Sequence, residues 1–320
     1  MERHPKIIYM GTPEFAVGPL KALLEAGYEI PAVVTVPDKP KGRGLQMAQS
    51  DVKKFALEAG GIDILQPEKL RDENFLAHLR SYNADLFIVV AFRMLPEVVW
   101  KMPKMGTFNL HASLLPKFRG AAPINWAIIK GEKETGVTTF FIDDKIDTGN
   151  ILLQKTTPVS PGETVETLHD RLMEMGSALV VETVQGLEKG IITPKPQDTS
   201  LLTEATSAAP KLNKENTRID WTKTAAEVDA LVRGLSPYPS ALTTMVTGSG
   251  EKIEMKVFST ELTDRKAGKT TVTAKAIYVP CSDNLLEITS LQPAGKKRMG
   301  AVDFINGHKN LVGDENIRFF

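Results

Sequence analysis

The run from Ala84 to Ala91 constrains the fold more than any other stretch, because it is apolar at every position except Asp85. Such a run is typical of a strand that is buried on both faces in the middle of a parallel sheet. Other strand-like segments alternate with helical patterns along the first half of the chain. The expected strands are residues 6–10, 30–36, 62–65, 106–110, 136–142 and 151–159. The alternation predicts an α/β fold with a doubly wound, mostly parallel, Rossmann-like sheet.

Several classes of protein are excluded by what the sequence lacks. The first strand-to-helix turn has only Gly11 before Gly18, so the three-glycine pattern of dinucleotide-binding proteins is missing. The single cysteine, Cys281, rules out a disulfide framework, and the five histidines show no metal-ligand spacing. No apolar run is long enough to cross a membrane. We therefore expect a cytoplasmic, monomeric protein without a metal or a membrane partner.

The second half of the chain changes character. A helical pattern over 161–189 is followed by residues 191–210, which are rich in Pro, Thr, Ser and Ala and are typical of a linker. A helix over 224–235 then has Thr224 and Glu227 at capping-box spacing. Short alternating runs follow and predict a small, OB-like, antiparallel β-barrel. The expected division is a first domain at 1–190, a linker at 191–210 and a second domain at 211–320.

Polar side chains at the end of the strand over 106–110 point to chemistry. Asn109 and His111 are two residues apart, so they leave an extended strand on the same face. One can donate to a carbonyl oxygen while the other moves a proton. Asp147 precedes a glycine at another strand-to-loop junction. The alternatives stay open at this point, because a lone histidine is often structural and Asp147 suits a simple turn.

Longer motifs around these residues resemble the 10-formyltetrahydrofolate-dependent formyltransferases. The first domain carries Gly11-Thr12-Pro13-Glu14-Phe15-Ala16, Pro37-Asp38-Lys39-Pro40, Arg119-Gly120-Ala121-Ala122-Pro123-Ile124 and Asp147-Thr148-Gly149. The second carries Arg218-Ile219-Asp220-Trp221 and Leu291-Gln292-Pro293-Ala294-Gly295. The resemblance therefore covers nearly the whole chain.

The resemblance implies an activity and a site. Formyl would pass from 10-formyltetrahydrofolate to the α-amino group of methionine on initiator methionyl-tRNA, with Asn109, His111 and Asp147 as the catalytic residues. The residues expected along the folate are Ser113, Leu114, Leu115 and Pro116. Those expected to contact tRNA are Lys39, Lys41 and Arg43 in a basic loop and Lys296 and Lys297 in the second domain. We expect the loop to lack fixed structure without RNA, although both basic groups suit solvated surface charge too.

The chain departs from the family pattern in three places. Phe92-Arg93 stands where an aromatic residue and a glycine are usual, Asp51 replaces a proline, and Lys145 and Asn150 flank Asp147. The alternatives are formyl transfer to a sugar-nucleotide amine or to glycinamide ribonucleotide, hydrolysis of the formyl folate, and a non-catalytic RNA-binding role. The second domain and the basic loop argue against the other acceptors, and the intact catalytic residues argue against the non-catalytic role.

Overall fold

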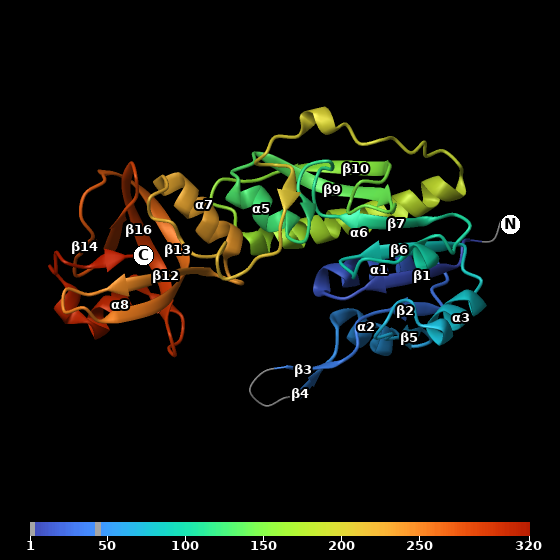
Figure 1. Ribbon diagram of the computed structural model, residues 1–320, viewed down its shortest axis with the longest axis horizontal. Coiled ribbons are helices and arrows are strands. Elements are labelled where there is room, and N and C mark those ends of the chain that lie inside the picture. The colour runs from blue at the N-terminus through green and yellow to red at the C-terminus, as the bar shows by residue number, and fades with distance from the viewer. Residues whose placement is uncertain (1–3, 42–45) are drawn as a thin grey trace. The chain divides into compact units, whose positions relative to one another are not determined.

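A computed structural model of the protein describes residues 4–41 and 46–320. The chain divides into two compact units (Figure 1). Unit 1 consists of Met1–Gly120, Thr135–Thr157 and His169–Ala208, and unit 2 of Ala121–Glu134, Pro158–Leu168 and Ala209–Phe320. No helix in the part of the chain that the structure describes is long and apolar enough to cross a membrane.

Unit 1 is built on a seven-stranded sheet in the order β10-β9-β7-β6-β1-β2-β5. The strands are β1 (Ile7–Gly11), β2 (Ala32–Val34), β5 (Asp63–Leu65), β6 (Leu86–Val90), β7 (Thr107–His111), β9 (Glu134–Phe141) and β10 (Ile151–Pro158). The pairs from β5 to β7 are parallel, and β7 pairs with β9 antiparallel. The predicted doubly wound, mostly parallel sheet is confirmed.

The order of the strands fixes where a ligand can bind. The chain runs outward from β1 to β2 and β5, and it then returns to β6 on the other side of β1. This reversal opens a crevice beyond the carboxyl ends of the strands, which is where open α/β sheets bind ligands. β7 lies next to β6, so Asn109 and His111 come to this same edge of the sheet.

Helices pack on the faces of this sheet. They are α1 (Val17–Glu25), α2 (Asp51–Ala59), α3 (Glu73–Ser81), α4 (Glu97–Trp100) and the long α6 (Val165–Glu188), with a 3-10 turn, η1, at Glu14–Ala16. α6 begins four residues later than its apolar pattern predicts, because Gly162 adopts a positive φ of 74° in the turn before it. A Cβ at Gly176 would lie 2.8 Å from a methyl group of Leu110, so α6 packs closely against the strand that carries His111.

The basic loop is flanked by two short paired strands, β3 (Lys39–Lys41) and β4 (Gln46–Ala48), where an irregular connection was expected. Side chains hold the base of this hairpin. Lys53 Nζ lies 2.6 Å from Asp38 Oδ2, and Gln66 Nε2 donates to Asp38 Oδ1 at 2.8 Å. These bonds from Lys53 and Gln66 hold the pKa of Asp38 below its usual value. Arg43, and with it the expectation for the tip of the loop, lies outside the described residues.

Unit 2 combines helices with a curled antiparallel sheet, so the predicted C-terminal barrel fold is confirmed as a half-barrel. The sheet consists of β12 (Ala241–Val246), β13 (Lys252–Lys266), β14 (Thr271–Val272), β15 (Ile277–Pro280), β16 (Asn284–Pro293), β17 (Met299–Gly300) and β18 (Arg318–Phe319). β13 is much longer than the predicted run over 253–258. Register shifts between β13 and β16 bend this strand and allow the sheet to curl.

The helices of unit 2 come from distant parts of the sequence. They are α5 (Pro123–Ile129), α7 (Ala225–Leu235), α8 (Ala301–Gly307) and a 3-10 turn, η3, at Lys309–Leu311. The predicted capping box between Thr224 and Glu227 is present at the start of α7. A Cβ at Gly234 would lie 2.6 Å from Ile129 Cγ1, so α7 packs closely on α5.

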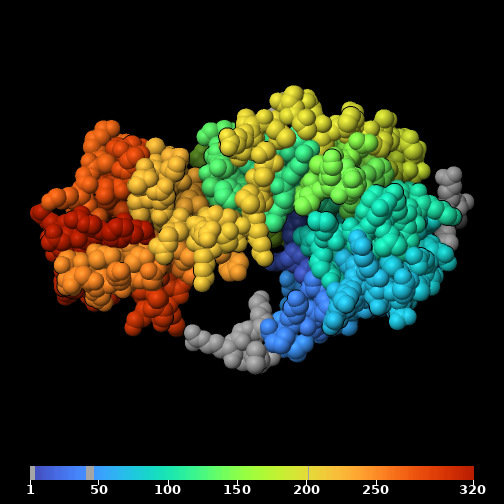
Figure 2. All heavy atoms as spheres, in the orientation of Figure 1, coloured from blue at the N-terminus to red at the C-terminus, as the bar shows by residue number. Residues whose placement is uncertain are grey.

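The segment over 191–210, expected to be a linker, is tied to unit 1 at several points. Lys195 bridges to Ile151, and Phe118 N donates to Thr206 O at 2.7 Å. The segment also contains a 3-10 turn, η2 (Thr199–Leu201), and a short strand, β11 (Ala208–Ala209). Figure 2 shows it as a band of yellow spheres on the surface.

Candidate active site

His111 ends β7, and its side chain is only 7% exposed. Its Nε2 lies 2.8 Å from Phe118 O. Since a carbonyl oxygen only accepts hydrogen bonds, Nε2 carries the proton of this bond. Nδ1 is then the nitrogen that gains or loses a proton, and it faces Asp147. The backbone thus selects the tautomer and aims the reactive nitrogen of His111.

Asp147 lies across from this nitrogen, in the turn between β9 and β10. Asp147 Oδ2 is 3.8 Å from His111 Nδ1, beyond hydrogen-bond range but within the distance of an ion pair with a protonated histidine. The same oxygen accepts a hydrogen bond from Gly120 N at 2.8 Å. The structure therefore brings together two of the three predicted catalytic residues, His111 and Asp147, which are 36 positions apart in the sequence.

The turn that carries Asp147 has little freedom. Asp147 adopts a positive φ of 54°, which Asp tolerates better than most residues. A Cβ at Gly149 would lie 1.7 Å from Phe141 O, so only glycine fits where the turn passes this carbonyl. Thr148 Oγ1 also donates to Asp143 Oδ1 at 2.7 Å.

Asn109 lies two residues before His111, in register with Val89 of β6 and Phe140 of β9. Its side chain is half-buried and leaves the strand on the face that His111 uses. Within residues 4–41 and 46–320, no hydrogen bond joins its amide to another side chain or to the backbone. The donors of this amide are therefore not committed to another group within the described residues.

The loop predicted to lie along the folate is packed tightly behind His111. Ser113, Leu115 and Pro116 are buried, and Leu114 is half-buried. Ser113 Oγ donates to Lys117 O at 2.6 Å, and Leu115 N donates to Thr138 Oγ1 at 3.2 Å. The structure thus fixes the backbone of this loop, while its contact with folate stays a prediction.

Two further residues complete the surroundings of Asp147: Arg119, which the sequence analysis named only as part of a family motif, and Gln197, which it did not name. Gln197 bonds the backbone on both sides of Thr148, and Arg119, in the two-residue strand β8 (Arg119–Gly120), bonds Gln197. Gln197 lies in the polar segment over 191–210, where no apolar period or motif marks it. No signal in the sequence pairs it with Asp147.

The unusual Arg93 connects two loops at the carboxyl edge of the sheet. Its guanidinium donates to Pro67 O at 2.8 Å and to Glu68 O at 3.0 Å, and it lies 5.2 Å from the centre of the Phe92 ring. Burial lowers the pKa of this guanidinium. Lys145 and Asn150, the other departures at this edge, are exposed.

The residues predicted to contact tRNA fall in different units. Lys39 is exposed on β3 of unit 1, and Lys41 ends that strand. Lys296 and Lys297 are exposed in the turn between β16 and β17 of unit 2. Next to them, Arg298 lies 4.5 Å from the centre of the Phe258 ring.

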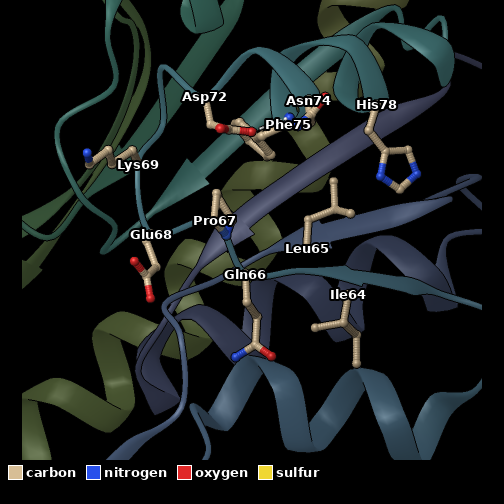
Figure 3. A pocket seen from close by; sticks show the side chains of 10 residues that line it. All are labelled: Ile64, Leu65, Gln66, Pro67, Glu68, Lys69, Asp72, Asn74, Phe75 and His78. Carbon is tan, nitrogen blue, oxygen red and sulfur yellow. Dashed lines mark hydrogen bonds between the residues drawn. The ribbon is translucent and has the colours of Figure 1, made fainter.

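Unit 1 also has an open depression, and Asn109, His111 and Asp147 do not line it. Figure 3 shows the side chains that line it, which come from the end of β5, the connection after it and α3. Gln66 at its rim uses its amide to bond Val36 O and Asp38. The candidate site is therefore the edge beside β7 and not this depression. No group of three or more His, Cys, Asp and Glu residues in the described ranges is arranged to hold a metal ion.

Comparison with known proteins matches both halves of the chain. A family model described as "Formyl transferase" matches residues 5–184, and one described as "Formyl transferase, C-terminal domain" matches residues 211–309. The chain is 49% identical over 307 residues to a methionyl-tRNA formyltransferase of Flavobacterium johnsoniae, covering 94% of this chain and 96% of the relative. A methionyl-tRNA formyltransferase of Parabacteroides distasonis is 50% identical over 314 residues, covering 96% and 97%.

Solved structures share the fold at lower identity. HypX from Aquifex aeolicus in complex with tetrahydrofolic acid has a TM-score of 0.62 at 19% identity, over 97% of this chain and 48% of that one. WlaRD, a sugar 3N-formyl transferase, has a TM-score of 0.63 at 20% identity, over 92% and 100%. The chain thus spans about half of HypX and all of WlaRD.

Proposed function

This chain belongs to the formyl transferase family, and we propose that it moves the formyl group of 10-formyltetrahydrofolate to the α-amino group of methionine on initiator methionyl-tRNA. The product is N-formylmethionyl-tRNA for the initiation of translation. Identity of about half over nearly the full length of the methionyl-tRNA formyltransferases supports this acceptor. The observation that carries the chemistry is the placement of His111 Nδ1 at 3.8 Å from Asp147 Oδ2, beside the uncommitted amide of Asn109.

The acceptor needs little activation. An α-amino group has a pKa near 8, so a useful fraction is already neutral at pH 7. Its lone pair attacks the formyl carbon, a C–N bond forms, and the bond between that carbon and the folate nitrogen breaks. The co-substrate supplies the activated formyl group, the amine loses one proton, and the released folate nitrogen gains one, so the exchange balances.

Each residue of the site has a separate task in this exchange. Asn109 donates its amide to the formyl oxygen as negative charge develops there, and protonated His111 donates from Nδ1. A well-placed donor of this kind contributes roughly 3 to 4 kcal/mol to the transition state. Asp147 stabilises the charge on His111 and takes the amine proton through water.

The surrounding residues are proposed to bind the two substrates. Ser113, Leu114, Leu115 and Pro116 lie along the folate, since they continue directly from His111. Lys39, Lys41, Arg43, Lys296 and Lys297 neutralise phosphates of the tRNA. We also propose that the protein is cytoplasmic and that it acts as a monomer. Light scattering of the purified chain tests the oligomeric state.

An acceptor assay tests the proposed function. The protein is incubated with 10-formyltetrahydrofolate and, in separate reactions, with charged initiator tRNA, with glycinamide ribonucleotide, with a sugar-nucleotide amine, and with buffer alone. We expect formyl transfer with charged tRNA only. Transfer to another amine, or release of formate in buffer at the same rate, would assign the site to a different acceptor or to hydrolysis.

The division at 1–190, 191–210 and 211–320 is a further proposal. A fragment of residues 1–190 should fold and bind the folate while losing most activity on tRNA. A fragment of residues 1–209 keeps Gln197 and Thr206 and serves as the matched comparison. If neither fragment folds, the chain does not divide at this segment.

A further inference from the structure

Gln197 uses all the hydrogen-bonding capacity of its amide around Asp147. Nε2 donates to Asp147 O at 2.8 Å and to Gly149 O at 2.9 Å. Oε1 accepts from Arg119 Nε at 3.1 Å and from Arg119 Nη2 at 2.6 Å. The side chain therefore holds the two carbonyls on either side of Thr148 and is itself held by a guanidinium.

The orientation of this amide has no alternative. Arginine has only donors, so Oε1 must face Arg119. The two carbonyls only accept, so Nε2 must face them. Most residues of the segment over 191–200 are exposed, but Gln197 is half-buried. The segment thus turns this one polar side chain inward, toward the turn that carries Asp147.

Arg119 and Gly120 bring a second contact to the same turn. Arg119 acts through Gln197 on the backbone of Asp147, and the neighbouring Gly120 N donates to the Asp147 carboxylate at 2.8 Å. Backbone and carboxylate are therefore fixed from one strand, β8. These two contacts flank the carboxylate whose Oδ2 lies 3.8 Å from His111 Nδ1.

We propose that Gln197 is a positioning residue for the proposed formyl transfer, because it fixes the turn that aims Asp147 at His111. The inference rests on the proposed function of these two residues. The end of the turn after Thr148 has other contacts as well, because Gly149 passes close to Phe141 O and Phe141 N donates to Asn150 O. Loss of the two bonds lets the carboxylate move relative to His111, and a displacement of about 1 Å costs up to roughly 100-fold in rate.

Gln197→Glu is the sharpest test. The variant keeps the size of the side chain and its partner Arg119, but it replaces two donors by an acceptor that faces two carbonyls. We expect kcat to fall roughly 10-fold to 100-fold, with the KM values for folate and for charged tRNA unchanged. Gln197→Met, which removes the polar atoms without adding charge, should show the same division between kcat and KM.

A spectroscopic signature separates positioning from a structural role. In protein labelled with ¹⁵N-histidine, the His111 nitrogen signals, assigned with His111→Asn, should shift at fixed pH in both Gln197 variants. Gln66→Glu is the matched control for these signals and for thermal unfolding. Gln66 also donates from Nε2 to two oxygens, Val36 O and Asp38 Oδ1, and accepts from a cation, Lys53, in the same unit.

The outcomes distinguish the possible failures. If wild-type protein does not formylate charged tRNA, the proposed function fails. If His111→Asn and Asp147→Asn remove activity while Gln197→Glu keeps wild-type kcat and His111 signals, the positioning role is overturned. A Gln197→Glu variant that loses thermal stability as Gln66→Glu does, with the His111 signals unmoved, also overturns it.

Discussion

Two connections in unit 1 are held by the same arrangement of hydrogen bonds around a glutamine, but we expect them to have different roles. In the turn of Asp147, Gln197 bonds two carbonyls and accepts from Arg119. At the base of the basic hairpin, Gln66 bonds Val36 O and Asp38 and accepts from Lys53. In both regions a glutamine links a cation to the backbone of a connection between strands.

The regions differ in what lies beyond the anchor. The turn of Asp147 ends against buried neighbours, and the Asp147 side chain is 16% exposed. The paired strands of the hairpin face solvent beyond Gln66, and Met47 on β4 is 60% exposed. Proton transfer needs atoms held to fractions of an ångström, whereas contact with a long, charged RNA needs reach. We therefore expect the bonds of Gln197 to fix the position of Asp147, and the bonds of Gln66 to fix only the base of the hairpin from which β3 begins.

The largest effect should come from substitutions of His111 and Asp147. His111→Ala and Asp147→Ala should each lower kcat by roughly 10³-fold, because proton transfer in the transition state is worth about 10²-fold to 10⁴-fold. Melting temperature should change little, and His78→Ala on the outer helix α3 is the control. A loss of stability that matches the loss of activity would make both residues structural.

Asn109→Ala should come next. Removal of one donor to a developing oxyanion costs on the order of 10²-fold to 10³-fold in turnover. Folate binding, measured by fluorescence or calorimetry, should be retained, because the amide acts mainly on the transition state. Lost folate binding with turnover intact at saturation would assign Asn109 to ground-state binding.

In the sequence between β3 and β4, Arg43→Ala should weaken the use of charged tRNA without altering folate binding. A hydrogen bond to a charged group is worth about 1.5 to 3 kcal/mol, which corresponds to roughly 10-fold to 100-fold in kcat/KM for tRNA. The rate is measured with sub-saturating tRNA. Wild-type formylation under these conditions would remove Arg43 from the tRNA site, and Arg43→Lys should recover part of the loss.

A smaller effect is expected from the basic turn of unit 2. Lys296→Ala and Lys297→Ala should each weaken tRNA binding uniformly across sequences and reduce the salt slope of log K by about 1. Titrations at several salt concentrations measure both quantities. An unchanged slope would mean that these charges stay solvated in the complex.

The smallest effect concerns pH at the base of the hairpin. The pKa of Asp38 is lowered in the folded protein by bonds from Lys53 and Gln66, so the anchor stabilises the fold above the pKa of an unfolded Asp, about 3.9. This contribution is lost as the pH falls through the lower folded value. Amide exchange of β3 and β4 should therefore increase as the pH falls through that value. Asp38→Asn should reproduce the loosening at pH 7.

The sequence was sufficient for the fold and for the pair on β7. Long apolar runs predicted the central strands because their burial requires them, and spacing alone placed Asn109 and His111 on one face. Arg119 and Gln197 could not be predicted, because their partnership with Asp147 depends on hydrogen bonds across 78 and 50 positions. Hydrogen bonds between such distant residues produce no periodic pattern in the sequence. The hairpin was missed because Pro40 lies within β3, paired with Met47, and a proline in a run of residues argues against a strand.

The order of the strands has a consequence for synthesis of the chain on the ribosome. β1 pairs with β2 on one edge, but its other edge stays unpaired until residues 86–90 of β6 have been made. The site is completed later still, since Gln197 follows every residue of the proposed catalytic set. Nascent chains arrested after residue 190 should therefore protect the central strands from protease while the turn of Asp147 is still cleaved, and chains arrested well beyond residue 209 should protect both.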